Sequence, residues 1–167
     1  MRHAPVYQLK DFLDRFPLIE LPITISQDTI NDISKASKPL PPEMISEYLI
    51  PLEEGLVNDE YTEFVACFQL PLQQDFIGLV YWRADLLQYH YVLVTLDKKT
   101  GAAIDRRVIA GTTYVEGELT QSSAAIQEEL TIYVVSGQGS VEDYSFRASG
   151  STASRLQISE QGKIMEL

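Results

Sequence analysis

The chain has 167 residues, of which 45% are hydrophobic and 22% charged, a composition typical of one globular domain rather than of a disordered or collagen-like chain. Its 24 acidic and 13 basic residues give a formal net charge of −11, which repels phosphate groups, so we expect no nucleic-acid partner. No apolar run approaches the roughly 18 residues that a membrane-spanning helix needs, so we also expect no membrane insertion.

The N-terminus lacks the apolar stretch of a signal peptide, and the sequence therefore predicts a cytoplasmic protein. An envelope location would require a leader that has been removed. Cys67 is the only cysteine, which excludes a disulfide within the chain. It lies in an apolar, strand-like run, so we expect a buried and unreactive thiol.

The first sixty residues predict short helices and extended segments. Apolar side chains at helical spacing over 7–16 predict an amphipathic helix, which Pro17 ends because its ring breaks the hydrogen-bond ladder. The segment 16–25 is apolar but interrupted by prolines, a pattern typical of an extended edge segment. Another short helix is expected to begin at Pro42 and to end at Pro51.

From about residue 61 the apolar residues alternate, as in β-strands. Four of them are predicted to share one strand face: Phe64, Ala66, Phe68 and Leu70. Residues 75–83 and 89–96 are apolar on both faces, which indicates central strands. Between the second of these and the next strand, Asp97 is placed to bond the turn backbone, and Gly101 to adopt the positive φ that closes a hairpin.

Later strands are predicted over residues 102–109, 112–120, 130–135 and 143–149, followed by a hairpin from 156 to 164. Strands this close together leave no room for crossover helices, so the sheet must be mainly antiparallel. The predicted fold is α+β and mainly β: one domain over 1–167, with a helical and irregular cover over 1–60 and a meander of about eight strands over 61–167. A curled sheet, a barrel and a sandwich all remain open.

The sequence assigns no catalytic, metal-binding or cofactor-binding residue. The only histidines are His3 and His90, and His90 shares a predicted strand face with apolar residues, which favours a structural role. Zinc spacings and a carboxylate calcium loop are absent, and Glu142 beside Asp143 fits a solvated corner. The glycines in 136–140 are interpreted as a hairpin loop rather than a phosphate-binding loop.

Three functional hypotheses remain. Two long stretches without any basic residue, 39–82 and 108–146, favour a non-enzymatic binding or protein-interaction module whose acidic surface meets a basic partner, for example as an inhibitor or immunity-type protein. A small-molecule binder would use an aromatic-lined pocket, and the alternative for the same side chains is a shared core: Tyr81, Trp82, Tyr89 and Tyr91. A carboxylate-based hydrolase would use acids such as Glu116 and Glu118, predicted on one strand face. The oligomeric state stays open.

The order of several segments resembles a group of uncharacterised small proteins from Bacteroidetes-type bacteria. The similar segments are 16–23, 40–49, 91–97, 100–105 and 125–132. The resemblance implies a mostly-β domain of unknown function and supplies no catalytic residues. Many proteins of that group resemble exported lipoproteins, whereas this chain shows neither a leader nor a lipobox cysteine.

Overall fold

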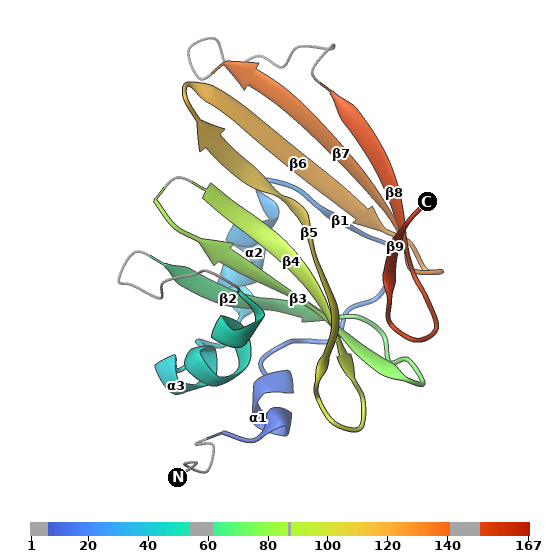
Figure 1. The fold of residues 1–167 in the computed structure, drawn as a ribbon. Helices are drawn as coiled ribbons and strands as arrows, with labels where there is room; N and C mark the ends of the chain where they lie inside the picture. Colours follow the sequence, from blue (N-terminus) through green and yellow to red (C-terminus); the bar gives the residue numbers. More distant parts are fainter. Residues whose placement is uncertain (1–6, 54–61, 87, 141–150) are drawn as a thin grey trace.

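The computed structural model describes residues 7–53, 62–86, 88–140 and 151–167 (Figure 1). Its short helices are α1 (Leu9–Leu13), α2 (Thr29–Ala36), α3 (Pro42–Met44), the π-turn η1 (Ile45–Leu49) and the 3-10 turn η2 (Ile50–Leu52). Its strands are β1 (Ile23–Ile25), β2 (Glu63–Gln69), β3 (Phe76–Ala84), β4 (Gln88–Asp97), β5 (Ala103–Val115), β6 (Glu118–Ile126), β7 (Thr131–Ser140), β8 (Thr152–Ile158) and β9 (Ile164–Glu166).

The nine strands form one sheet in which β2 to β9 are neighbours in sequence order and β1 pairs with β6. Every one of these strand pairs is antiparallel. The predicted mainly-β antiparallel meander with short helices is therefore confirmed. Of the three forms left open, the barrel is excluded, because the sheet does not close.

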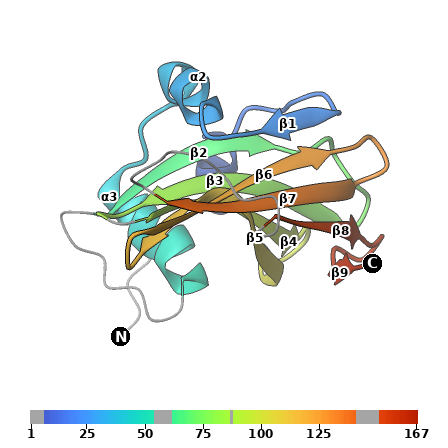
Figure 2. The ribbon, with the colours of Figure 1, turned by 90° about the horizontal axis from the view of Figure 1, so that it is seen from above.

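The sheet divides into two layers because β5 and β6 each change partner along their length. β5 pairs with β4 as far as Thr113 and with β6 from Gly111 onward. β6 pairs with β5 only as far as Ser122. Beyond that point β1 pairs with the same edge of β6, with Ile25 opposite Ala124. One layer is thus β2 to β5 and the other is β1 with β6 to β9 (Figures 1 and 2).

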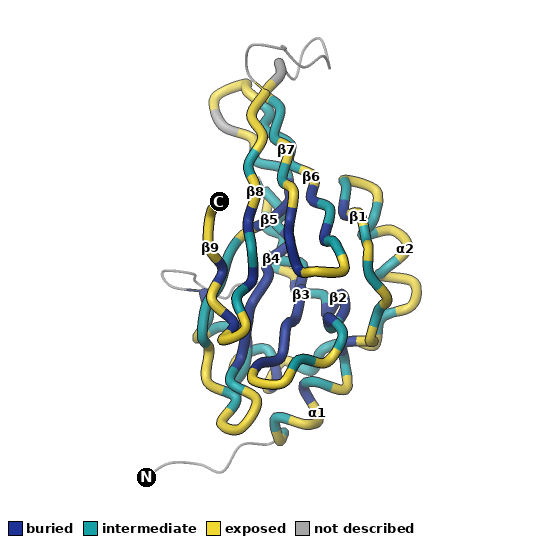
Figure 3. Tube along the Cα trace, turned by 90° about the vertical axis from the view of Figure 1, so that its right-hand side faces the viewer, coloured by how far each residue is buried: buried dark blue, intermediate teal, exposed yellow. Residues whose placement is uncertain are grey.

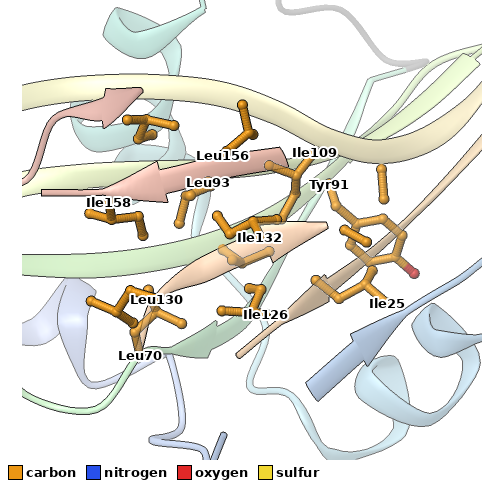
Figure 4. Close-up of a cluster of buried hydrophobic side chains, with 14 of the residues drawn as sticks. Ile25, Leu70, Tyr91, Leu93, Ile109, Ile126, Leu130, Ile132, Leu156 and Ile158 are labelled. Carbon is orange, nitrogen blue, oxygen red and sulfur yellow. The ribbon is translucent and has the colours of Figure 1, made fainter. Parts of the chain in front are cut away.

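Two apolar cores hold these layers and the helices together. The larger lies between the layers and includes Leu70, Tyr91 and Ile132 (Figure 4). The second lies on the opposite face of β2 to β4, where Phe12 of α1 and Leu49 of η1 pack against the strands. The strands β3 and β4 are consequently covered on both faces, as the apolar runs over 75–83 and 89–96 predicted, and Figure 3 shows them mostly buried.

A bulge in β2 overturns the expectation that its four apolar residues share one face. Ala66 pairs with Tyr81 and Phe68 with Val80, so Cys67 is an extra residue in the strand. Phe64 and Ala66 accordingly face the helices, whereas Phe68 and Leu70 face the core between the layers. The bulge lets one strand supply large apolar side chains to both cores.

Other boundaries also differ from the prediction. The helix expected over 7–16 spans only Leu9–Leu13. The expected strands 102–109 and 112–120 are one long β5 and the start of β6, joined by a two-residue turn in which Glu116 and Gly117 have φ of 50° and 82°. Gly137 and Gly139 lie within β7 rather than in a loop. Pro51 does not end the helical segment, because the 3-10 turn η2 continues to Leu52. The expected strand 143–149 lies outside the described residues.

The hairpin from β4 to β5 forms as predicted. Asp97 Oδ1 accepts hydrogen bonds of 2.8 Å from the backbone N–H groups of both Lys99 and Thr100. Gly101 has a φ of 76°, a conformation that costs glycine little. None of the helices in the described ranges is both long and apolar enough to cross a membrane.

Candidate functional site

A row of paired residues, all polar except Gly111, crosses the five neighbouring strands β3 to β7. Register places Arg83 opposite His90, His90 opposite Gly111, Gly111 opposite Ser122, and Ser122 opposite Ser136. Side chains paired across antiparallel strands point to the same face. On β3 and β4 the row therefore lies on the face that the helices cover. On β6 and β7 it lies on the face that turns toward the core between the layers.

A groove of about 180 Å³ lies along this row, between β5 and the strands β6 to β8. Its polar walls carry five hydroxyl groups, those of Thr113, Thr120, Ser122, Ser136 and Ser154, together with the imidazole of His90. Gly111, the cationic Arg107 and five apolar residues also line the groove; the apolar residues are Val108, Ile109, Ala110, Val134 and Leu156. We call this feature the hydroxyl groove.

The imidazole of His90 is held in place and uncharged at neutral pH. Its Nε2 lies 3.1 Å from Thr113 Oγ1, and either atom can donate the hydrogen bond, depending on the tautomer. Burial lowers the pKa of His90, and the positive charge of Arg83 lowers it further. A second hydrogen bond of 2.7 Å joins the hydroxyls of Ser122 and Ser136.

Gly111 sits at the centre of the row because no other residue fits there. A Cβ atom at this position would lie 2.3 Å from the carbonyl oxygen of Tyr89 and 2.9 Å from the His90 ring. Its φ of 149° is also rare for residues with a side chain. The missing side chain lets the backbones of β4 and β5 approach closely at this point of the row, and Gly111 is one of the residues that line the groove.

An ion cluster adjoins the row at Arg83. Glu53, which follows η2 and is only 5% exposed, accepts hydrogen bonds from the Tyr81 hydroxyl and from Arg83 Nη1, the latter at 2.7 Å. Arg106 Nη2 lies 2.8 Å from both carboxylate oxygens of Glu53. Three donors from β3 and β5 thus converge on one carboxylate and fix the end of the helical segment to the sheet.

The cluster keeps Glu53 ionised. Burial opposes the charged carboxylate, but the hydrogen bonds from Tyr81, Arg106 and Arg83 outweigh burial and lower the pKa of Glu53. The pKa of the Tyr81 hydroxyl is raised by burial and by its bond to Glu53. Because Glu53 already has its donors in place, it is poorly suited to act as a catalytic base.

An open hollow of about 520 Å³ lies beside this cluster. Glu53, Arg83, Asp105 and Arg106 line it together with apolar atoms of Pro51 and Ile104. The Arg106 side chain is 32% exposed, and that of Arg83 is 13% exposed. We call this feature the arginine hollow.

The residues singled out in the sequence do not assemble into one site. Tyr81 packs in the helix-covered core, whereas Tyr91 and Trp82 pack in the core between the layers. Trp82 lies 5.9 Å from Tyr89 between ring centroids, but none of these four aromatic residues lines the hydroxyl groove or the arginine hollow. Adjacent residues of a strand point to opposite faces, so Tyr81 and Trp82 could not share a pocket wall.

The remaining candidates lie apart from both sites. Cys67 is buried, and burial raises its thiol pKa, which makes it unreactive. Glu116 lies in the turn and Glu118 begins β6, so the two do not share a strand face as expected. His3, Glu142 and Asp143 lie outside the described residues.

Neither the ion cluster nor the groove is predicted by the sequence. Glu53, Arg83 and Arg106 lie on separate segments, and no local pattern joins them. A weak signal existed for the groove, since hydroxyl residues recur in β6 and in β7, but their facing positions depend on the register. Within the described ranges, no group of three or more histidine, cysteine, aspartate or glutamate side chains is placed to hold a metal ion.

The comparisons with known proteins give no match: no protein-family model, no curated protein and no solved structure aligns significantly with the chain.

Proposed function

We propose that this protein is a non-catalytic binding module that holds a small, uncharged, hydroxyl-bearing molecule, such as a saccharide, in the hydroxyl groove. The observation that carries the proposal is the composition of that groove, where five hydroxyl groups and one imidazole surround about 180 Å³. Each hydroxyl can both donate and accept a hydrogen bond, which suits a ligand that carries hydroxyls itself.

The charge of the lining favours a neutral ligand. The lowered pKa of His90 leaves its imidazole uncharged at neutral pH. Arg107 is the one cationic side chain among the lining residues, and it lies 3.5 Å from Glu166, which offsets its charge. The apolar lining residues Val108, which is exposed, and Val134, which is partly buried, supply surface for the C–H face of a sugar ring.

Isothermal titration calorimetry against a panel of neutral monosaccharides and disaccharides tests the proposal, with sugar acids and aliphatic alcohols as comparators. We expect saturable binding of at least one neutral saccharide and weaker binding of its acid counterpart. Ser122→Val should weaken the binding about tenfold, since it removes a hydroxyl from the lining.

The matched control is Ser123→Val, because Ser123 lies on the same strand but pairs with Val135, so it belongs to the opposite face and is exposed. Binding by the Ser123 variant should equal that of the wild type. The proposal fails if no saccharide binds, or if both valine variants weaken binding equally.

A further inference from the structure

We propose that the arginine hollow is a second binding site, which takes a ligand through a carboxylate group. This site is separate from the hydroxyl groove and does not depend on the function proposed for it. The hollow of about 520 Å³ opens beside two guanidinium groups that share one internal carboxylate, that of Glu53. The cluster therefore carries more hydrogen-bond donors than Glu53 alone can satisfy.

The donors left over are those of the arginines. A guanidinium has five N–H groups, and Arg106 bonds both oxygens of Glu53 through Nη2 alone. The Nε atoms of Arg83 and Arg106 are buried and have no hydrogen-bond partner among the described residues. Buried donors in folded proteins nearly always have a partner, so these two show that the cluster is rich in donors. Neither Nε is itself open to the hollow, and a ligand would meet the outer N–H groups of Arg106, whose side chain is 32% exposed.

Glu53 itself indicates which acceptor the arginines prefer. Its planar carboxylate lies 2.7 Å from Arg83 Nη1 and 2.8 Å from Arg106 Nη2. Pairs of parallel N–H bonds from one guanidinium to one carboxylate are a recurrent and strong arrangement. Because Arg106 is one-third exposed at the hollow, an incoming carboxylate can reach the N–H groups that Glu53 does not use.

The acidic residues beside the arginines favour a ligand group with one negative charge over a group with two. Asp105 also lines the hollow. Its Oδ1 accepts a hydrogen bond of 2.9 Å from the backbone N–H of Arg106, and its Oδ2 accepts one of 2.8 Å from the backbone N–H of Ile164. These backbone donors offset its charge only in part. A carboxylate is therefore favoured over a doubly charged phosphate, which Glu53 and Asp105 would repel.

The side-chain Nε–Hε resonances of the arginines in the full-length protein report directly on this site. We propose to titrate acetate, succinate, inorganic phosphate and a short peptide with one glutamate, each against sodium chloride at equal ionic strength. The Hε resonance of Arg106 should shift saturably with a carboxylate and not with chloride. A stronger response to free succinate identifies a small acid as the ligand, and a stronger response to the peptide identifies an acidic protein segment.

Arg106→Lys keeps the positive charge but removes the planar fork, and it should weaken carboxylate binding about tenfold. Arg155→Lys is the matched control, because Arg155 is exposed on β8, away from the hollow, and its change should leave the affinity unaltered. Because Arg106→Lys has no Arg106 Hε, binding to this variant is measured on the Arg83 Hε resonance, and its spectrum without ligand shows whether the variant is folded.

The proposal is overturned if chloride and carboxylates shift Arg106 equally, if Arg155 responds as Arg106 does, or if phosphate binds more tightly than any carboxylate. Saccharide binding in the hydroxyl groove should be the same in wild type and Arg106→Lys. A failure of carboxylate binding with saccharide binding intact, or the reverse, tells the two proposals apart.

Discussion

Replacing Glu53 with glutamine removes the negative charge that Arg83 and Arg106 share, and it leaves Arg83 with the carboxylate of Asp85, 3.6 Å from its Nη2. Removing one partner of a buried ion pair costs about 3–5 kcal/mol, because the remaining charge stays buried without compensation. Glu53 is 5% exposed and belongs to this class. Arg106, however, is 32% exposed and can recover hydration. We therefore expect the lower end of the range, a loss of about 3 kcal/mol in the free energy of unfolding.

Urea unfolding at pH 7, followed by the fluorescence of the only tryptophan, Trp82, measures this loss. The midpoint should fall while the slope of free energy against urea stays unchanged. Glu43→Gln is the control, since Glu43 is exposed at the start of the same helical segment. A loss at Glu53 within about 0.5 kcal/mol, the usual range for surface changes, would refute the reasoning.

The same pair of proteins has a predictable pH dependence. The pKa of Glu53 is lower in the folded protein than its ordinary value of 4.5. The stability that its ionised form contributes is therefore complete above about pH 4.5 and is lost as the pH falls through the folded pKa. The stability difference between wild type and Glu53→Gln should shrink below pH 4.5; a difference that grows in acid would contradict the assigned charge state.

Other positions give independent tests. Gly111→Ala should destabilise the fold by about 2–3 kcal/mol in urea unfolding, because its Cβ would meet the Tyr89 carbonyl oxygen; a neutral effect would contradict the close approach. Thr95→Val should cost about 1–2 kcal/mol in thermal or urea unfolding, since the buried Thr95 hydroxyl donates to the Gly162 carbonyl at 2.6 Å. The Cys67 thiol should react with Ellman's reagent only as fast as the protein opens, and a rapid reaction in the native state would show that it is accessible.

Much of the fold could be predicted because its signals are local. The hairpin after β4 needs only Asp97 to bond the turn and Gly101 to take a positive φ, and both occur as expected. The alternation after residue 61 and the short spacing between strands are enough to require an antiparallel sheet. The turn at Glu116 and Gly117 had the signal of a glycine in a two-residue loop, but the polar stretch 112–120 is typical of one exposed strand, and this pattern concealed the turn.

The features that escaped prediction depend on contacts between distant segments. The bulge at Cys67 lets one strand contribute side chains to both cores. The sequence alone does not show that two cores exist. The ion cluster unites Glu53 with Arg83 and Arg106 only after η2 has packed on the sheet. The groove requires the register that sets Ser122 beside Ser136, and register is a property of the assembled sheet.

The partner exchange along β6 has a consequence for how the chain assembles during synthesis. Ile25 of β1 pairs with Ala124 of β6, roughly one hundred residues later in the chain. The ribosome therefore completes β1 long before its docking site exists, and closing so long a loop carries a large entropic cost. The pairing of β1 with β6 must therefore form late. In a nascent chain halted before β6, Ile25 still lacks its strand partner.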